Sequence, residues 1–308
     1  MSSSSDTSAD SSTIDAWRAR LGRIGVWCAT DGMDVQKAAS FAEEVEAHGY
    51  GALWLPETLG RDPFAHAAHL ADRTSRLLLA TGIANIHHRH PGAMLQAANT
   101  VGEQSGGRFL LGIGVSHQPV VEGLRGLDYG KPVATMRKYL DGMDGSPYMA
   151  VAPDQPVPRL LAALGPKMLE LAAARADGAH PYFTTPEHTA TARSILGPDK
   201  LLCVEQKVVL TEDATEGRDT ANAALSMYAE LPNYRNNWLR LGYTEDEIES
   251  RDPSFVDAVV AWGPADALQE RVQAHLDAGA DHVCIQALSI GSPFKVDRDT
   301  LATLAPGS

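Results

Sequence analysis

Two side chains that could carry a proton directly follow apolar runs of the sequence. His117 comes after the run from Arg108 to Val115, and Glu57 follows the run that begins at Ala52. Histidine titrates near neutral pH and a carboxylate can accept or release a proton, so either group could act as a general acid or base. His117 is our first candidate for this role and Glu57 is the second. A loop histidine bonded to backbone would show the same local pattern.

An anion site is indicated by the consecutive residues Gly165, Pro166 and Lys167. Proline suits the first turn of a helix, so the free N–H groups of that turn, the positive end of the helix dipole and the Lys167 ammonium would lie together. This combination of groups binds phosphate. The same tripeptide could also be an ordinary helix cap.

A run of imidazoles occurs at His87, His88 and His90, with Arg89 between them. Imidazole is a common metal ligand, but no carboxylate or cysteine stands at a recognised metal-ligand spacing, and adjacent side chains diverge. We therefore predict no metal site here, and Arg89 could instead assist an anionic ligand. A metal-dependent barrel hydrolase or lyase is the alternative from another enzyme class.

The candidate residues are positioned by an alternation of strands and helices. Eight strand-like runs are expected near residues 23–28, 52–57, 77–84, 108–115, 159–164, 179–183, 201–210 and 282–288. This pattern predicts an α/β fold of the (β/α)8 TIM barrel type, whose active site lies at the carboxyl ends of the strands. Residues 215–263 exceed a single crossover helix and predict a helical insertion between the seventh and eighth strands. The alternative, an open doubly wound sheet, usually has a glycine-rich phosphate loop, which is absent after the first strand.

Composition limits the classes of partner. A formal charge of −13 at pH 7 argues against nucleic acid and anionic membranes as partners. The three cysteines lie apart in apolar runs without a CxxC pair, which suits reduced thiols and a cytoplasmic location. The polar, acidic start predicts a disordered tail over residues 1–20, and residues 21–308 are expected to form a single domain.

Three stretches resemble one family, the luciferase-like monooxygenase superfamily. They are RLLLATGIANI (residues 76–86), AANTVGEQSGGRFLLGIGVSH (residues 97–117) and GPKMLELAAARADGAHPYFTTPEH (residues 165–188). Within the superfamily, the chain is similar to the actinobacterial branch of coenzyme F420-dependent oxidoreductases. The resemblance covers roughly residues 22–288. It implies a TIM barrel that binds F420 or FMN near the ends of the third and fourth strands.

The resemblance also implies roles for particular residues. A non-prolyl cis peptide bond would lie at Gly82–Ile83, behind the redox ring. The cofactor site would be formed by the end of the third strand, the end of the fourth strand and the loop before residue 168: Gly82, Ile83, Ala84, Asn85, Val115, Ser116, Leu164, Gly165, Pro166 and Lys167. Relatives often have a glycine in place of Leu164. Thr58 replaces the histidine of an acid–histidine pair in sugar-phosphate relatives, so a sugar-phosphate dehydrogenase is not expected.

The sequence thus predicts an F420-dependent oxidoreductase that transfers a hydride between deazaflavin C5 and a small organic substrate. An FMN-dependent monooxygenase is the alternative within the family, and a cofactor-binding protein without turnover is a further one. Tyr228, Tyr234, Trp238 and Phe255 either wall a substrate pocket or hold the helical insertion together. Relatives often form homodimers, although no stripe in this sequence indicates one.

Overall fold

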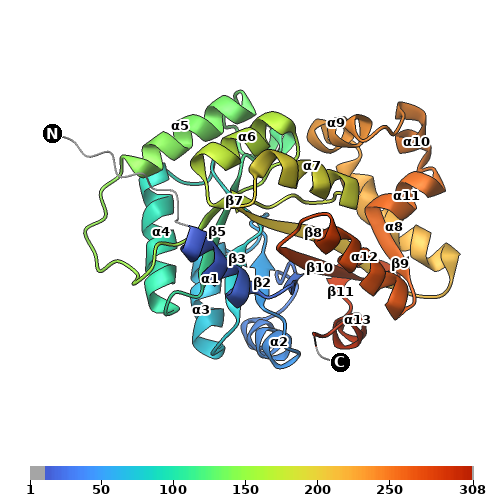
Figure 1. Cartoon of the computed structure of the whole chain (residues 1–308), viewed down its shortest axis with the longest axis horizontal. Helices are drawn as coiled ribbons and strands as arrows, with labels where there is room; N and C mark the ends of the chain where they lie inside the picture. Colours follow the sequence, from blue (N-terminus) through green and yellow to red (C-terminus); the bar gives the residue numbers. More distant parts are fainter. Residues whose placement is uncertain (1–10, 307–308) are drawn as a thin grey trace.

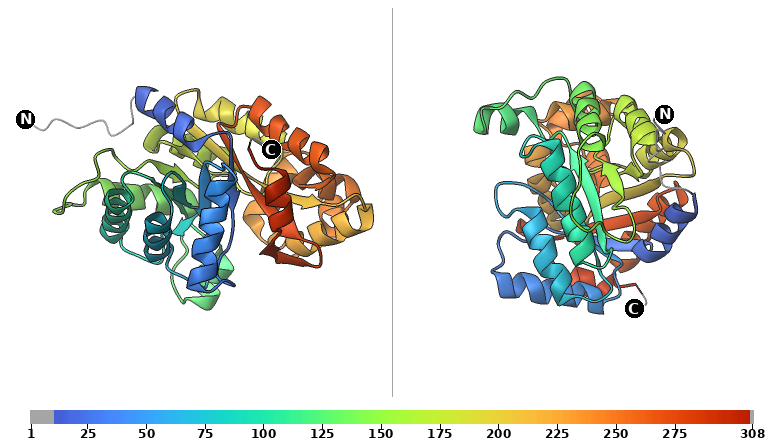
Figure 2. Two further views of the ribbon diagram at one scale, coloured as in Figure 1. Left: turned by 90° about the horizontal axis from the view of Figure 1, so that it is seen from below. Right: turned by 90° about the vertical axis from the view of Figure 1, so that its left-hand side faces the viewer.

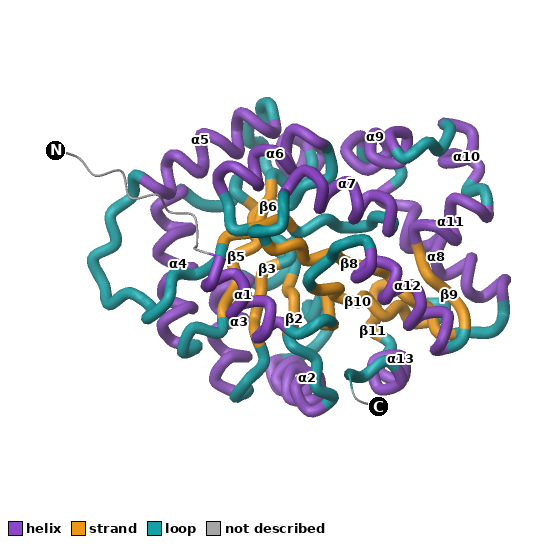
Figure 3. Tube along the Cα trace, viewed as in Figure 1, coloured by secondary structure: helices purple, strands orange, loops and turns teal. Residues whose placement is uncertain are grey.

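The centre of the computed structural model, which describes residues 11–306, is a closed barrel of parallel strands surrounded by helices (Figures 1 and 3). In order around the barrel, the strands are β1 (Ile24–Trp27), β2 (Ala52–Leu55), β3 (Leu78–Thr81), β5 (Phe109–Gly114), β6 (Arg159–Leu161), β7 (Gly178–Ala179), β8 (Leu201–Leu210) and β10 (His282–Ser289). Strand β10 pairs with both β8 and β1, which closes the ring. The predicted (β/α)8 fold is confirmed.

Amphipathic helices cover the outside of the barrel. They are α2 (Val35–Ala47), α3 (Pro63–Arg73), α4 (Pro91–Gln104), α5 (Pro132–Asp144), α6 (Pro166–Arg175), α7 (Pro186–Leu196), α12 (Ala265–Asp277) and α13 (Arg298–Thr303). Several begin with proline, as in α3, where the Asp62 side chain also accepts hydrogen bonds from the N–H groups of Phe64 and Ala65. A short π-helical segment, η1 (Pro119–Leu124), follows β5 and was not expected from the sequence.

The predicted insertion between the seventh and eighth barrel strands is present. It contains α8 (Ala214–Tyr228), α9 (Pro232–Arg240), α10 (Glu245–Ser250), α11 (Pro253–Val259) and the short strand β9 (Val260–Gly263). These helices gather on one side of the barrel, at the right of Figure 1 and of the left view of Figure 2. Trp238 and Phe255 are fully buried in their own cluster, so these two side chains hold the insertion together.

Two short strands extend the sheet beyond the predicted eight. Strand β9 pairs parallel with the carboxyl half of β8, and β11 (Ser292–Val296) pairs antiparallel with β10. A further two-residue strand, β4 (Ala84–Asn85), continues the line of β3 and pairs with β5. Strands this short carry little periodicity, which explains why β9 and β11 were missed.

The prediction of a disordered tail is wrong for residues 11–20. These residues belong to α1 (Ser11–Leu21), whose Ile14, Trp17 and Leu21 are buried with the inward-facing side chains of the barrel. Arg18 of α1 also pairs with Asp281 at 2.9 Å. The apolar residues recur on one helical face and close the amino-terminal end of the barrel. The rest of the predicted tail, residues 1–10, lies outside the described residues.

The three cysteines are buried free thiols, and two of them, Cys203 and Cys284, lie in the interior of the barrel. Among the described residues, no helix combines the length and apolar character that crossing a membrane requires.

Buried histidines make the stability of this fold sensitive to acid. His180, His275 and His282 have pKa values lowered by burial to about 4, 3 and 4. In His282 both ring nitrogens are engaged, because Nδ1 lies 2.9 Å from the Gly22 carbonyl oxygen and Nε2 accepts from Trp54 Nε1 at 3.2 Å. If the His282 ring bound a second proton, its Nε2 would become a donor directed at the Trp54 N–H, which is also a donor.

We predict that the free energy of unfolding decreases between pH 6.5 and pH 5. In the unfolded chain the histidine pKa values lie near 6.5, so these side chains bind protons over this range, whereas in the folded chain they stay neutral. The free energy of unfolding therefore falls as the pH falls, by up to about 2 kcal/mol for each of the three histidines. Urea denaturation at a series of pH values measures this slope. His275→Asn should reduce the slope, whereas His69→Asn, at an exposed position of α3, should leave it unchanged. An equal stability at pH 7 and pH 5 would contradict the prediction.

Candidate active site

A cavity of about 1010 Å³ lies where the carboxyl ends of the barrel strands meet. Its lining residues come from the segments that follow β1, β2, β3, β5, β6 and β7, and from the later parts of β8 and β10. Residues of α8, α9 and β11 complete the lining. All of the site residues predicted from the sequence line this cavity except Ala84. Ala84 is fully buried in the core and pairs with Ile113, so it does not line this cavity.

The end of the third strand forms a tightly packed floor for one side of the cavity. The Gly82–Ile83 peptide bond is cis. Trp27 Nε1 donates a hydrogen bond to the Gly82 carbonyl oxygen at 2.8 Å. A Cβ atom at position 82 would lie 2.8 Å from Trp27 Nε1 and 3.2 Å from His180 Nε2, so only glycine fits there. Gly114 is similarly confined, because a Cβ would lie 2.8 Å from the Ile83 side chain.

Glu57 is an anchored carboxylate that joins the ends of two strands. It accepts hydrogen bonds from both terminal nitrogens of Arg89 and from the Asn85 N–H at 2.7 Å, and His88 Nδ1 lies 3.1 Å away. Burial alone would raise the pKa of the Glu57 carboxyl, but these hydrogen bonds and the Arg89 charge hold it below its ordinary value. Glu57 therefore stays ionised at neutral pH. Its geometry favours a positioning role over the proton-carrying role predicted from the sequence.

Most side chains of the histidine run contact Glu57 or the start of α4. His88 and Arg89 turn toward Glu57, and Arg89 also pairs with Asp62 at 3.0 Å, so Arg89 is not available to an anionic ligand. His90 turns away and accepts from the Gly92 N–H at the start of α4, at 3.1 Å. His87 stacks on Tyr129, with 5.7 Å between the ring centroids.

His117 lies at the cavity wall with one ring nitrogen unpaired. Its Nδ1 atom is buried and has no hydrogen-bond partner among the described residues, and its ring lies 5.6 Å from that of Tyr234. Burial lowers the pKa of His117, and a hydrogen bond with the Asn233 side chain only partly opposes this shift. The preceding Ser116 has a left-handed backbone, with φ of 59°, and its carbonyl oxygen accepts from Tyr129 at 3.1 Å. A neutral imidazole in this setting can accept a proton.

One end of the cavity is cationic although the chain as a whole is acidic. Gly165 is the N-cap of α6 and offers no side chain to the first turn, so the N–H groups there are not capped by it. The exposed Lys167 lines the cavity beside this turn, and Arg240 of α9 reaches it from the insertion: a Cβ at Gly165 would lie 3.5 Å from an Arg240 nitrogen. Arg240 had no distinguishing signal in the sequence, because only the fold brings α9 to α6.

The deep side of the cavity holds a buried ion pair. Lys207 Nζ lies 3.1 Å from Glu205 Oε1, and the two side chains are 1% and 0% exposed. The ammonium also lies 3.7 Å from the ring centroid of Tyr182 and 3.8 Å from that of Phe183. Burial lowers the pKa of Lys207 to about 8, although the charge of Glu205 opposes that shift. The sequence signal for this pair was two charged residues inside the apolar run 201–210.

Next to the ion pair lies a neutral hydrogen-bonded chain of cavity residues. The Tyr182 hydroxyl donates to Gln286 Oε1 at 2.9 Å and lies 3.0 Å from the Tyr228 hydroxyl. Tyr228 and Tyr234 both line the cavity, unlike Trp238 and Phe255. The two tyrosines therefore belong to the pocket, and the two other aromatic residues belong to the core of the insertion.

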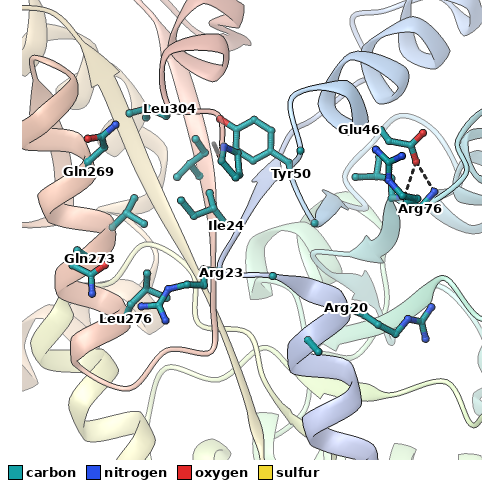
Figure 4. Close-up of a pocket in the computed structure, with 18 residues that line it drawn as sticks. Arg20, Arg23, Ile24, Glu46, Tyr50, Arg76, Gln269, Gln273, Leu276 and Leu304 are labelled. Atoms are coloured by element: carbon teal, nitrogen blue, oxygen red, sulfur yellow. Dashed lines mark hydrogen bonds between the residues drawn. The ribbon is translucent and has the colours of Figure 1, made fainter. Parts of the chain in front are cut away.

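A second cavity, of about 630 Å³, lies at the opposite end of the barrel (Figure 4). It is lined by residues that precede β1, β2 and β3, among them Arg23, Tyr50 and Arg76, and by α12. There the Glu46 carboxylate accepts from the backbone N–H groups of residues 75–77. Active sites of (β/α)8 barrels lie at the carboxyl ends of the strands, so the larger cavity is the candidate.

We predict that His117 is neutral at pH 7 and titrates below pH 6.5. Burial disfavours the imidazolium, so the midpoint lies on the acidic side of the ordinary value. NMR titration of the ring Cε1–H signals measures it, with His117→Asn identifying the signal by its loss. A midpoint at or above pH 6.5 would contradict this view of the site.

Comparison with known proteins agrees with the fold. The family model described as luciferase-like monooxygenase matches residues 19–282. A putative coenzyme F420-dependent oxidoreductase of Mycobacterium tuberculosis is 28% identical over 276 residues, which cover 73% of this chain and 79% of that protein. A 5,10-methylenetetrahydromethanopterin reductase of Methanolobus tindarius is 31% identical over 162 residues, 47% of this chain and 49% of the reductase.

Solved structures share the fold at low sequence identity. An F420-dependent secondary alcohol dehydrogenase in complex with an F420–acetone adduct aligns with a TM-score of 0.69 and 14% identity, covering 92% of this chain and 98% of that one. A Baeyer–Villiger monooxygenase constituent from Pseudomonas putida in complex with FMN aligns with a TM-score of 0.64 and 16% identity, covering 92% and 96%. Because the family model spans most of the barrel, the chain belongs to the luciferase-like monooxygenase family.

Proposed function

We propose that this protein is an F420-dependent oxidoreductase that exchanges a hydride between the deazaflavin and an organic substrate. The observation that carries the proposal is the large cavity with two unlike ends: a cationic helix start at α6, and a floor of closely packed strand ends at Gly82 and Gly114. The relatives named for F420 support this choice of cofactor.

The residues at the cationic end fit an anionic cofactor tail. The first turn of α6 presents N–H groups and the positive end of the helix dipole, and Lys167 and Arg240 add two cations. The chain has a net charge of −13, so a phosphate would be held by such local groups and not by the overall field.

The strand ends fit a flat ring. Gly82 and Gly114 expose backbone where a side chain would collide with its neighbours, and Val115 and Ser116 continue this surface. When bound, the deazaflavin would supply hydride transfer at its C5 atom.

The protein's own side chains would hold the strand ends in place and accept a proton from the substrate. The Glu57–Arg89 pair fixes the ends of the second and third strands, so the floor is rigid before a ligand arrives. His117, neutral and with an unpaired Nδ1, would accept the proton that a substrate releases when it loses a hydride.

Parallel fluorescence titrations of the full chain with F420 and with FMN test the proposal. We expect F420 to bind more tightly than FMN. Lys167→Met and Arg240→Met should each weaken F420 binding by about tenfold, because each removes a charge-assisted contact to the anionic tail. Lys138→Met is the matched control, since Lys138 is an exposed cation of α5 that does not line the cavity.

Other outcomes would favour a different function. Tighter binding of FMN than of F420 would favour the flavin monooxygenases of the family. A stoichiometric transition metal in the purified protein would favour the metal-dependent alternative. Tight F420 binding without reduction or oxidation by any donor or acceptor would indicate a carrier.

A further inference from the structure

The mouth of the large cavity carries exposed apolar side chains. Leu59, Met227 and Phe294 line it and are 67%, 58% and 71% exposed. They come from the segment after β2, from the end of α8 and from β11, and α8 packs against β11. Large apolar side chains gathered around one opening are typical of a binding surface.

The apolar character continues inward from the mouth. Val120, Val133, Ala224 and Leu231 also line the cavity, and none of these side chains carries a polar group. They give part of the cavity wall a hydrocarbon surface.

The polar groups of Tyr182, Tyr228 and Gln286 are neutral. Because the Gln286 amide oxygen can only accept, Tyr182 donates to it, and Tyr228 must then donate to Tyr182. Among the described residues, the Gln286 amide nitrogen donates no hydrogen bond, and the Tyr228 oxygen accepts none. One neutral donor and one neutral acceptor are thus left for a ligand.

The charge of the deep ion pair is already balanced. Lys207 is held by Glu205 and by the faces of Tyr182 and Phe183. If an anionic group of a ligand paired with Lys207 in place of Glu205, the Glu205 carboxylate would stay buried without its partner, at a large cost in free energy. Lys167 and Arg240 lie at the α6 end assigned above to the cofactor tail, and Lys295, an exposed cation next to Phe294, also lines the cavity.

We infer that the substrate is an uncharged, largely apolar molecule with a single hydroxyl or carbonyl group. Its oxygen is bound at Tyr228 and Gln286, and its hydrocarbon part extends toward Met227 and Phe294. This inference rests on the proposed function, because it leaves the α6 end of the cavity to the cofactor.

Three probes that share a six-membered carbon ring test the substrate class: cyclohexanol, myo-inositol and cyclohexanecarboxylate. Isothermal titration of the full chain, both alone and with saturating F420, measures their affinities. We expect cyclohexanol to bind at least tenfold more tightly than the polyhydroxylated or the anionic probe. The F420 affinity is measured separately in the same preparation.

Two substitutions test where cyclohexanol binds. Phe294→Ser should weaken cyclohexanol binding by about tenfold, because it removes apolar contact area at the mouth. Met149→Ser is the matched control: Met149 is a large apolar side chain that is 93% exposed and does not line the cavity. Melting temperatures of both variants show whether the fold is retained.

Three results would overturn the inference: binding of myo-inositol or cyclohexanecarboxylate as tight as that of cyclohexanol, no binding of any probe, or equal effects of the two substitutions. Failure of F420 to bind, with cyclohexanol still bound by the chain alone, would count against the proposed function and leave the substrate class standing.

Discussion

Closure of the barrel by the pairing of β10 with β1 is the constraint on which the site depends. The register places Ile24 opposite Val283 and Val26 opposite Ile285, joining the two ends of the chain. Once the ring is closed, the carboxyl ends of all its strands must meet at one rim. Residues as far apart in the sequence as Trp27 and Gln286 therefore line the same cavity. Helix α1 closes the other end with Trp17 and Leu21.

Electrostatic groups at this rim fall into two kinds. The Glu57–Arg89 and Glu205–Lys207 pairs are satisfied within the protein, and each holds part of the cavity wall in place. Such buried pairs contribute little net stability, so positioning is the better account of their presence. Lys167 at the start of α6 and Arg240 at the end of α9, in contrast, are exposed cations, and neither forms an ion pair with a carboxylate of residues 11–306.

The two predicted proton carriers show why residue type alone does not assign a role. Glu57 is surrounded by donors, which hold its pKa low and occupy its oxygens. His117 has an unpaired buried nitrogen and a pKa lowered by burial. Both follow a barrel strand, yet only the histidine keeps a free site for a proton. The difference comes from neighbours that lie about 30 residues away in the sequence for Glu57 and more than 100 for His117.

Apolar strand runs and helix periodicity are local patterns, so the sequence was enough to predict the barrel and the insertion. The family resemblance added several of the residues that line the cavity, since a parallel barrel places every strand end at one rim. The sequence also indicated the helix start at Gly165 and the strand ends at Gly82 and Ser116. Which side chains meet at that rim depends on contacts between segments that are far apart in the sequence. Arg240 reaches α6 from the insertion, Arg89 is committed to Glu57, and α1 packs beneath the barrel. These contacts join segments distant in the chain, and their geometry depends on packing and charge balance that no local pattern encodes.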